Sequence, residues 1–447
     1  MAQGHPCLGT TSRLSVPYYP TVFRFCLCST MAFVMKRLHI CICLSLAFGT
    51  VGASGAGTGV LPELAEVLGG FEVEAIEGRV AELEEALRPI FASMPHNAHG
   101  KIGQSVVRYL LHRLFMQRGW SVRGLEPSGQ GWSVGSPTEM LGQEMPRRAV
   151  EIFDARLRGE GLDLREVATL ASTFKHVLRG EMLERLRAAY RNHLLEQGAS
   201  LTEEEADRVL YTYVASYVTG KRLSGLSQSE VGAVEAQARK EYANFPQDVQ
   251  LALDAKRELL GQGAASFAGL ARAAEEFAER FGRSEDDYEC RPRRQDLLGL
   301  EHRGSGRVRL SDFYRAALHE GKWQFGESSG YLRQLGALDE SDPSDLQVII
   351  PNYINSKSNC VDASRYYSVC CISECDALLG QLERAIGSPS ATPSELASLV
   401  AALPSASVPA NRSLPAPLLR RLEEVAEGNG GQVPLHGRLF AQWMHHA

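Results

Sequence analysis

The chain has 447 residues and a formal net charge of −6, with 44% hydrophobic and 22% charged residues. This mildly acidic balance argues against a polyanion such as nucleic acid as the main partner. The part of the chain after Ala56 exceeds the usual size of a single hydrophobic core, so we expect two domains there.

The first 56 residues contain the three parts of a secretory signal peptide. Met35 is followed by the basic pair Lys36–Arg37, then by an uncharged run over Leu38–Ala53, and small residues close the segment. The apolar run is shorter than the roughly 20 residues that span a bilayer. We therefore expect residues 1–56 to be a leader whose true start is Met31 or Met35.

The leader directs the protein to the secretory pathway, to be secreted or kept in the lumen of an endomembrane compartment. The alternative is an uncleaved signal segment, which would anchor the chain in a membrane. Nothing after Ala56 is apolar for long enough to cross a bilayer. A membrane contact is therefore expected only if the signal segment stays uncleaved.

Amphipathic helices are expected throughout residues 57–285, which we interpret as a helical domain. Leu61–Phe91 combines acids with apolar residues at three- and four-residue spacing, which is typical of helices. Ser200–Glu205 predicts a helix start, because a capping hydroxyl precedes acids in the first turn. Ile102–Gln117 places an apolar stripe on one helix face, made by Val106, Val107, Leu110, Leu111, Leu114 and Phe115.

The pattern changes in residues 286–447, which we interpret as a second part of the chain. Short strand-like pieces, Arg307–Leu310 and Gln347–Ile350, precede a cysteine-rich segment and further helices. Ser388–Pro393 reads as a linker by composition. The expected fold class is mainly α: a helical bundle, then an EF-hand-like helix-loop-helix pair, then a Cys-rich helical C-terminal part.

Residues 301–312 resemble an EF-hand calcium loop in frame. Gly306 stands at the sixth position, where the chain turns sharply, and Val308 at the eighth, where a short strand pairs with a second loop. The expected second loop spans Leu335–Tyr353, with Val348–Ile350 as the pairing strand.

The chemistry of this loop departs from that of the family. Calcium takes oxygen ligands at positions one, three, five and twelve, but a cation, Arg303, stands at the third. Further arginines inside the loop add repulsion toward a metal ion. We expect a degenerate loop that has lost the ion, and a true calcium-binding protein is the alternative. The residues of this weak candidate site are Glu301, Ser305, Arg307 and Asp312.

Four of the five cysteines outside the leader lie within sixteen positions of one another. In an oxidising compartment we expect disulfides among the five, with one thiol left over, and adjacent cysteines bonded to different partners. The candidates are Cys290, Cys360, Cys370, Cys371 and Cys375. Asn411 begins the sequence Asn-Arg-Ser in a Pro-rich loop, and this predicts a glycosylation site.

Signals for catalysis are weak. Ser133 and Ser328 each stand in a Gly-x-Ser-x-Gly pattern, but neither follows the buried strand that a nucleophile elbow needs. His436, His445 and His446 lie near the end of the chain without a neighbouring acid or further ligand. We therefore assign no catalytic residue, and a hydrolase of unrecognised type is the alternative.

Over most of its length after the leader, the chain resembles an uncharacterised family of secretory-pathway proteins from single-celled algae. The resemblance is carried by HGKIGQSVVRYLLHRLFMQRGW, GRVRLSDFY, QVIIPNYI, YYSVCCISEC and VPLHGRLFAQWMHH. It implies no known activity. It also implies a further segment with another Cys and His, so we expect the chain to be truncated at Ala447.

These observations together predict a non-catalytic binding or structural protein of the secretory route. It carries an EF-hand-like module that does not bind calcium, and no other cofactor is expected. We expect a protein partner that the sequence does not identify, and no nucleic-acid partner.

Overall fold

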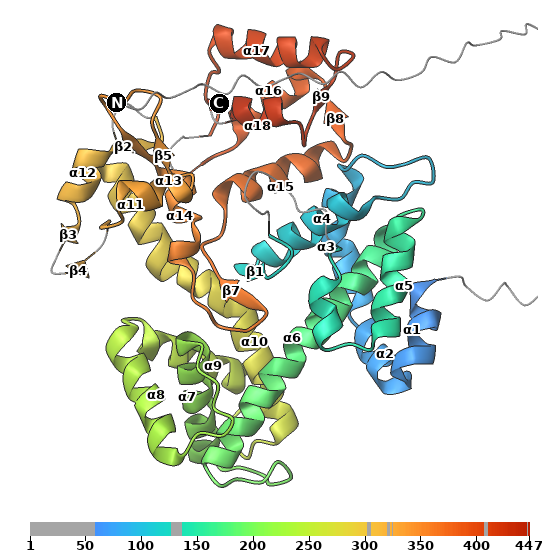
Figure 1. Cartoon of the computed structure of the whole chain (residues 1–447), viewed down its shortest axis with the longest axis vertical. Helices are drawn as coiled ribbons and strands as arrows, with labels where there is room; N and C mark the ends of the chain where they lie inside the picture. The colour runs from blue at the N-terminus through green and yellow to red at the C-terminus, as the bar shows by residue number, and fades with distance from the viewer. Residues whose placement is uncertain are drawn as a thin grey trace, which may run out of the picture. The chain divides into compact units, whose positions relative to one another are not determined.

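The computed structural model of the chain describes residues 59–126, 136–301, 305–319, 322–323, 325–405, 410–444 and 446–447 (Figure 1). Within these ranges the chain is mainly helical, which confirms the expected fold class. No helix there combines the length and the apolar character needed to cross a membrane. The leader lies outside the described residues, so the signal peptide stays a prediction.

The N-terminal helices break the predicted amphipathic stretch at glycines. One break is at Gly69, whose φ of +83° favours a residue without a side chain, and another is at Gly78. The predicted apolar stripe is buried on the fourth helix, except for the half-buried Val106. The helices are α1 (Val60–Leu68), α2 (Gly70–Glu77), α3 (Val80–Ala92), α4 (Gln104–Met116) and, after a short 3₁₀ helix at Glu139–Gln143, α5 (Arg147–Arg158).

The long helix α6 contacts α2 and α3, which precede it in the chain, and α7 and α10, which follow it (Figure 1). It begins at a capping box in which Asp163 and Glu166 satisfy each other's backbone N–H groups. The start predicted at Ser200–Glu205 is observed too, because Thr202 and Glu205 form the same motif. These helices are α6 (Leu164–Asn192), α7 (Glu203–Thr219), α8 (Gln228–Glu241), α9 (Phe245–Leu260) and α10 (Phe267–Glu285).

The strands are short and all pair antiparallel. β1 (Trp120–Val122) pairs with β7 (Tyr367–Val369) across almost 250 residues, so the Cys-rich segment returns to the N-terminal helices. The strand order of the three-stranded sheet is β2-β6-β5. Its strands are β2 (Arg307–Arg309), β6 (Gln347–Ile349) and β5 (Leu338–Asp339), and two further pairs are β3 (Leu318–His319) with β4 (Lys322–Trp323) and β8 (Ser390–Ala391) with β9 (Val433–Pro434).

Helix α10 continues beyond Glu285 without a break. A π-helical turn at Asp286–Cys290 carries it into the next helix, so no loop marks the boundary expected near this position. That boundary stays a prediction. The remaining helices are α11 (Arg291–Gly299), α12 (Leu310–Arg315), α13 (Ser329–Gln334), α14 (Ile350–Ile354), α15 (Glu374–Ile386), α16 (Pro393–Ala402), α17 (Ala416–Glu427) and α18 (Arg438–Met444), with a 3₁₀ turn at Lys357–Asn359.

Within the ranges given above, buried apolar side chains form three separate cores. The first contains the helices before residue 285 and also Tyr367 and Val369 of β7. The second lies between Cys290 and Cys371. The third lies in the C-terminal helices and includes Ala391, which is 2% exposed in β8. The linker expected at Ser388–Pro393 therefore contains a short strand that pairs with β9 and buries Ala391.

A buried carboxylate of the helical bundle predicts an unusual dependence of stability on pH. Asp248 of α9 is 2% exposed, and burial, with Glu285 and Glu289 nearby, raises its pKa to about 8. Burial likewise raises the pKa of Glu285 to about 7, although Arg293 opposes this. Such a group keeps its proton when folded and loses it when unfolded, so stability falls as pH rises from about 4 to 8.

We expect Asp248→Asn to remove most of this dependence. The free energy of unfolding at pH 8 rises by about 2 kcal/mol, and it is unchanged at about pH 3 and below, where both states hold the proton. Urea unfolding at a series of pH values measures this. Asp254→Asn, on the partly exposed face of the same helix, is the control and should have little effect at any pH. An equal effect of Asp248→Asn at both pH values would contradict the assignment.

Candidate functional site

Two helix-loop-helix units meet back to back in the second core. One consists of α11, β2 and α12, the other of α13, β6 and α14 (Figure 1). Val308 lies directly opposite Val348 in the strand pair. The N–H of Leu310 donates to the carbonyl of Leu346 at 2.8 Å, and the N–H of Ile350 donates to that of Gly306 at 3.0 Å. The contacts are reciprocal, so the two units are related by a local two-fold axis.

The side chains below the strand pair follow the same symmetry. Val308 and Val348 are both fully buried. The residues five positions after them, Phe313 and Tyr353, meet edge to face with their ring centres 5.2 Å apart. The hydroxyl of Tyr353 donates to Glu327 at 2.9 Å, and its pKa is raised by burial and by this carboxylate. Paired apolar residues of this kind hold the two units together.

The candidate loop residues are each occupied by a local partner. Glu301 accepts from the N–H of Gly306, where φ is +68° and the chain turns. Asp312 pairs with Arg315 at 2.8 Å. Ser305 is exposed, and its carbonyl accepts from Arg307 at 3.0 Å. The structure therefore brings Ser305 and Arg307 together, and gives Glu301 and Asp312 other local partners. Arg303 lies outside the described residues.

Arginines of the first loop reach the acids of the second. Nε of Arg307 donates to Asp339 at 2.7 Å, and Arg309 pairs with Asp345 at 3.3 Å. The N–H and hydroxyl of Ser341, together with Arg307, hold the pKa of Asp339 below its usual range. Each guanidinium group thus neutralises a carboxylate of the second unit. In the described residues no three His, Cys, Asp or Glu side chains are arranged to hold a metal.

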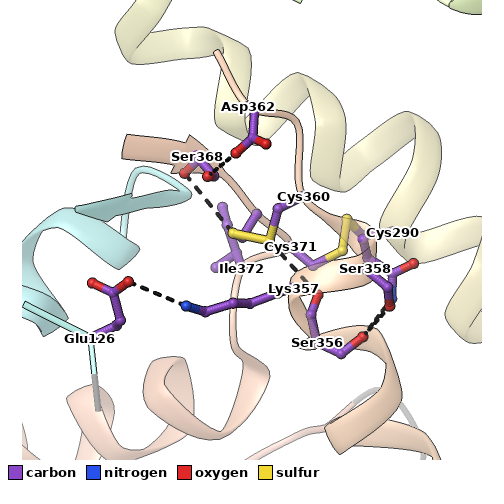
Figure 2. The surroundings of a disulfide bond; sticks show 12 residues. Glu126, Cys290, Ser356, Lys357, Ser358, Cys360, Asp362, Ser368, Cys371 and Ile372 are labelled. Atoms are coloured by element: carbon purple, nitrogen blue, oxygen red, sulfur yellow. Dashed lines mark hydrogen bonds and ion pairs between the residues drawn. A yellow bond between two sulfur atoms is a disulfide. The ribbon is translucent and has the colours of Figure 1, made fainter. Parts of the chain in front are cut away.

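Two disulfides lie in the described residues next to this module (Figure 2). Cys290 bonds to Cys371, with 5.6 Å between their Cα atoms, and Cys360 bonds to Cys370. The adjacent cysteines therefore have different partners, as predicted, and Cys375 is free and exposed. Cys290–Cys371 closes a loop with a sequence separation of 81. By limiting the conformations of the unfolded chain, a loop of this length raises the free energy of unfolding by roughly 4 kcal/mol.

Polar contacts surround the disulfides and fix the segment between them (Figure 2). The hydroxyl of Ser368 donates to Asp362 at 2.6 Å, and Lys357 pairs with Glu126 at 3.3 Å. The N–H of Ile372 donates to Asp286, whose pKa is nevertheless raised because it is buried. The segment is thereby tied to the N-terminal helices and to the turn between α10 and α11.

A buried ion pair that the sequence reasoning missed joins the third core to the first. Arg113 of α4 and Glu383 of α15 are 1% and 0% exposed and make two hydrogen bonds of 3.0 Å. Arg113 also donates to the hydroxyl of Tyr109 at 2.8 Å. The available signal was Arg113 itself, an arginine beside the apolar stripe of its helix. Its partner is 270 residues away, and nothing local points to it.

His436 lies against this ion pair in an arrangement that only partly resembles a catalytic triad. Its Nε2 lies 3.1 Å from the hydroxyl of Ser93 and 3.2 Å from Glu383, while Nδ1 faces Tyr109 at 3.4 Å. A triad needs the serine and the acid on opposite ring nitrogens. Ser93 is also fully buried and donates to the carbonyl of Ile90. The geometry of this cluster therefore differs from that of a catalytic triad, and its contacts connect His436 to Ser93, Tyr109 and Glu383. The sequence did not reveal this acid near His436.

The other sequence-predicted positions have simple places in the structure. The hydroxyl of Ser328 accepts from the N–H of Tyr331 and so caps α13, which explains its Gly-x-Ser-x-Gly context. Ser133 and His445 lie outside the described residues. Asn411 is exposed, with a φ of +58°, so its glycosylation stays a prediction.

Comparison of the chain with protein-family models, with curated proteins and with solved structures finds no match.

Proposed function

We propose that the protein is a non-catalytic binding or structural protein of the secretory route, built around an EF-hand-like pair that needs no calcium. The observation that carries the proposal is the pairing of Arg307 with Asp339 and of Arg309 with Asp345 across the two loops. Arginines of the first loop thus neutralise two acids of the second unit without a metal ion.

Physical reasoning supports a module that is stable without a metal. A calcium ion brought to the first loop would meet two guanidinium groups, and like charges a few ångströms apart repel by about 1 kcal/mol or more even when screened. The buried contacts of Val308, Val348, Phe313 and Tyr353 already hold the two units together. In this proposal the pair is a rigid scaffold for contacts with a protein partner.

The compartment in this proposal rests on two further observations. The sequence over Met35–Ala56 has the parts of a signal peptide. Two of the disulfides expected for an oxidising compartment form in the described residues. The resemblance to algal secretory-pathway proteins points the same way.

A calcium titration tests the module. We expect no heat when calcium is added to the purified protein, and the same melting temperature in calcium as in a chelator. Binding that is saturable at micromolar calcium and abolished by Asp312→Ala would establish the alternative, a calcium-binding protein.

A variant with restored oxygen ligands tests whether residues 301–312 have the frame of an EF-hand loop that has lost its calcium ligands. Arg303→Asp, Ser305→Asp and Asp312→Glu together supply oxygen at positions three, five and twelve. We expect this triple variant to bind calcium with a dissociation constant of about 10⁻⁴ M or tighter. Ser394→Asp, exposed on α16 and outside both loops, is the control and should bind none. A triple variant that folds but binds no calcium would contradict the EF-hand frame.

A further inference from the structure

Five arginines line one cavity in a chain that is acidic as a whole. The cavity has a volume of about 480 Å³, which lies in the range of small-molecule sites. It lies between the second half of α6, the loop after α7 and the segment closed by Cys360–Cys370. Glu181 and Glu184 also line the cavity. Its arginines are Arg185, Arg187, Arg191, Arg222 and Arg365.

Two of these arginines are held in place by aromatic rings instead of by carboxylates. The guanidinium of Arg185 lies 5.3 Å from the ring centre of Tyr217 and donates to the carbonyl of Ala363 at 2.7 Å. That of Arg187 lies 5.9 Å from the ring centre of Phe267. Rings of this kind orient a cation and leave its positive charge uncompensated.

The glutamates of the cavity are used to build its wall. Glu181 accepts from the hydroxyl of Ser364 and, at 3.1 Å, from the N–H of Arg365. Arg365 pairs with Glu144 at 3.0 Å and approaches Glu184 at 3.9 Å, while its buried Nε has no hydrogen-bond partner in the described residues. The wall therefore depends on the segment that Cys360–Cys370 closes.

Arg191 and Arg222 stand at the cavity with no ion pair to any described carboxylate, and both are exposed. They come from different elements, the end of α6 and the loop after α7. Collecting cations in one place is unfavourable unless an anion joins them. Guanidinium groups bind phosphate through paired hydrogen bonds, which a lysine does not provide.

We propose that this cavity binds a small phosphate-bearing polyanion. Arg191 and Arg222 would contact its charged groups, and Arg185 and Arg365 would make the electrostatic potential inside the cavity more positive. The sequence argues against a large polyanion as partner, but a cavity of this size takes a small ligand and depends on local charge. The inference goes beyond the proposed function, because the site is separate from the helix-loop-helix pair and holds whether or not calcium binds there.

Calorimetric titration with inorganic pyrophosphate at low salt tests the proposal. We expect saturable binding of one pyrophosphate per chain, and at least a tenfold weaker affinity for Arg191→Ala/Arg222→Ala. Arg191→Lys/Arg222→Lys should lose affinity as well, since charge alone does not replace the paired hydrogen bonds. Arg420→Ala is the matched control, because this arginine is exposed on α17 away from the cavity, and its affinity should equal that of the wild type.

Three results would overturn the proposal. The first is an absence of saturable binding of pyrophosphate to the wild-type protein. The second is an unchanged affinity in Arg191→Ala/Arg222→Ala, with its melting temperature showing that it is folded. The third is tighter binding of citrate than of pyrophosphate, which would assign the cavity to carboxylates.

Discussion

Replacing Glu383 with glutamine is expected to lower the free energy of unfolding by about 3 to 5 kcal/mol. The change removes the charged partner at both 3.0 Å contacts of the buried Arg113 guanidinium. The partly exposed Asp376, 3.6 Å from Nε, then remains as a weaker charged partner. It also removes the acid beside His436. Because the pair joins α4 to α15, we expect the C-terminal helices to lose protection from hydrogen exchange first. Urea unfolding measures the total loss.

A double variant distinguishes the loss of stability on removing one partner from the net contribution of the ion pair to stability. Arg113→Met/Glu383→Leu removes both charges and keeps apolar volume, so it should lose much less stability than Glu383→Gln alone. Glu424→Gln is the control at an exposed ion pair with Arg421, and we expect a loss below about 0.5 kcal/mol. If Glu383→Gln lowered the free energy of unfolding as little as the control does, the ion pair would not contribute to stability.

Gly282→Ala is expected to lower the free energy of unfolding by about 3 kcal/mol or more. A Cβ at this position of α10 would lie 2.0 Å from the carbonyl oxygen of Arg118. The obstacle is backbone, so no side-chain rotation relieves it. The neighbouring carbonyl of Gly119 accepts from the N–H of Cys370, and opening this contact would disturb the β1–β7 pair as well. Thermal unfolding measures the loss.

The matched control is a glycine of another helix. Gly232 of α8 is exposed, and an added Cβ would meet nothing within 4 Å. Gly232→Ala should therefore raise stability by about 0.5 to 1 kcal/mol through the better helix propensity of alanine. Similar effects of the two substitutions would contradict the close approach at Gly282.

The strand pair at the centre of the module illustrates what could be read from the sequence. A glycine at the sixth position and a valine at the eighth predict a turn followed by a short strand, and β2 begins directly after Gly306. The predicted pairing strand Val348–Ile350 overlaps β6, although Ile350 already begins α14. The predicted second loop begins at Leu335, directly after α13.

The sequence by itself determined the helical class, the capped helix start at Thr202, and the need for adjacent cysteines to find different partners. These follow from neighbours within a few positions, where periodicity and capping act. Only the tertiary structure decided that Arg113 meets Glu383, that Asp248 is buried among acids and that five arginines share a cavity. Such contacts join residues far apart along the chain, and their energies arise only once packing has removed water from both partners.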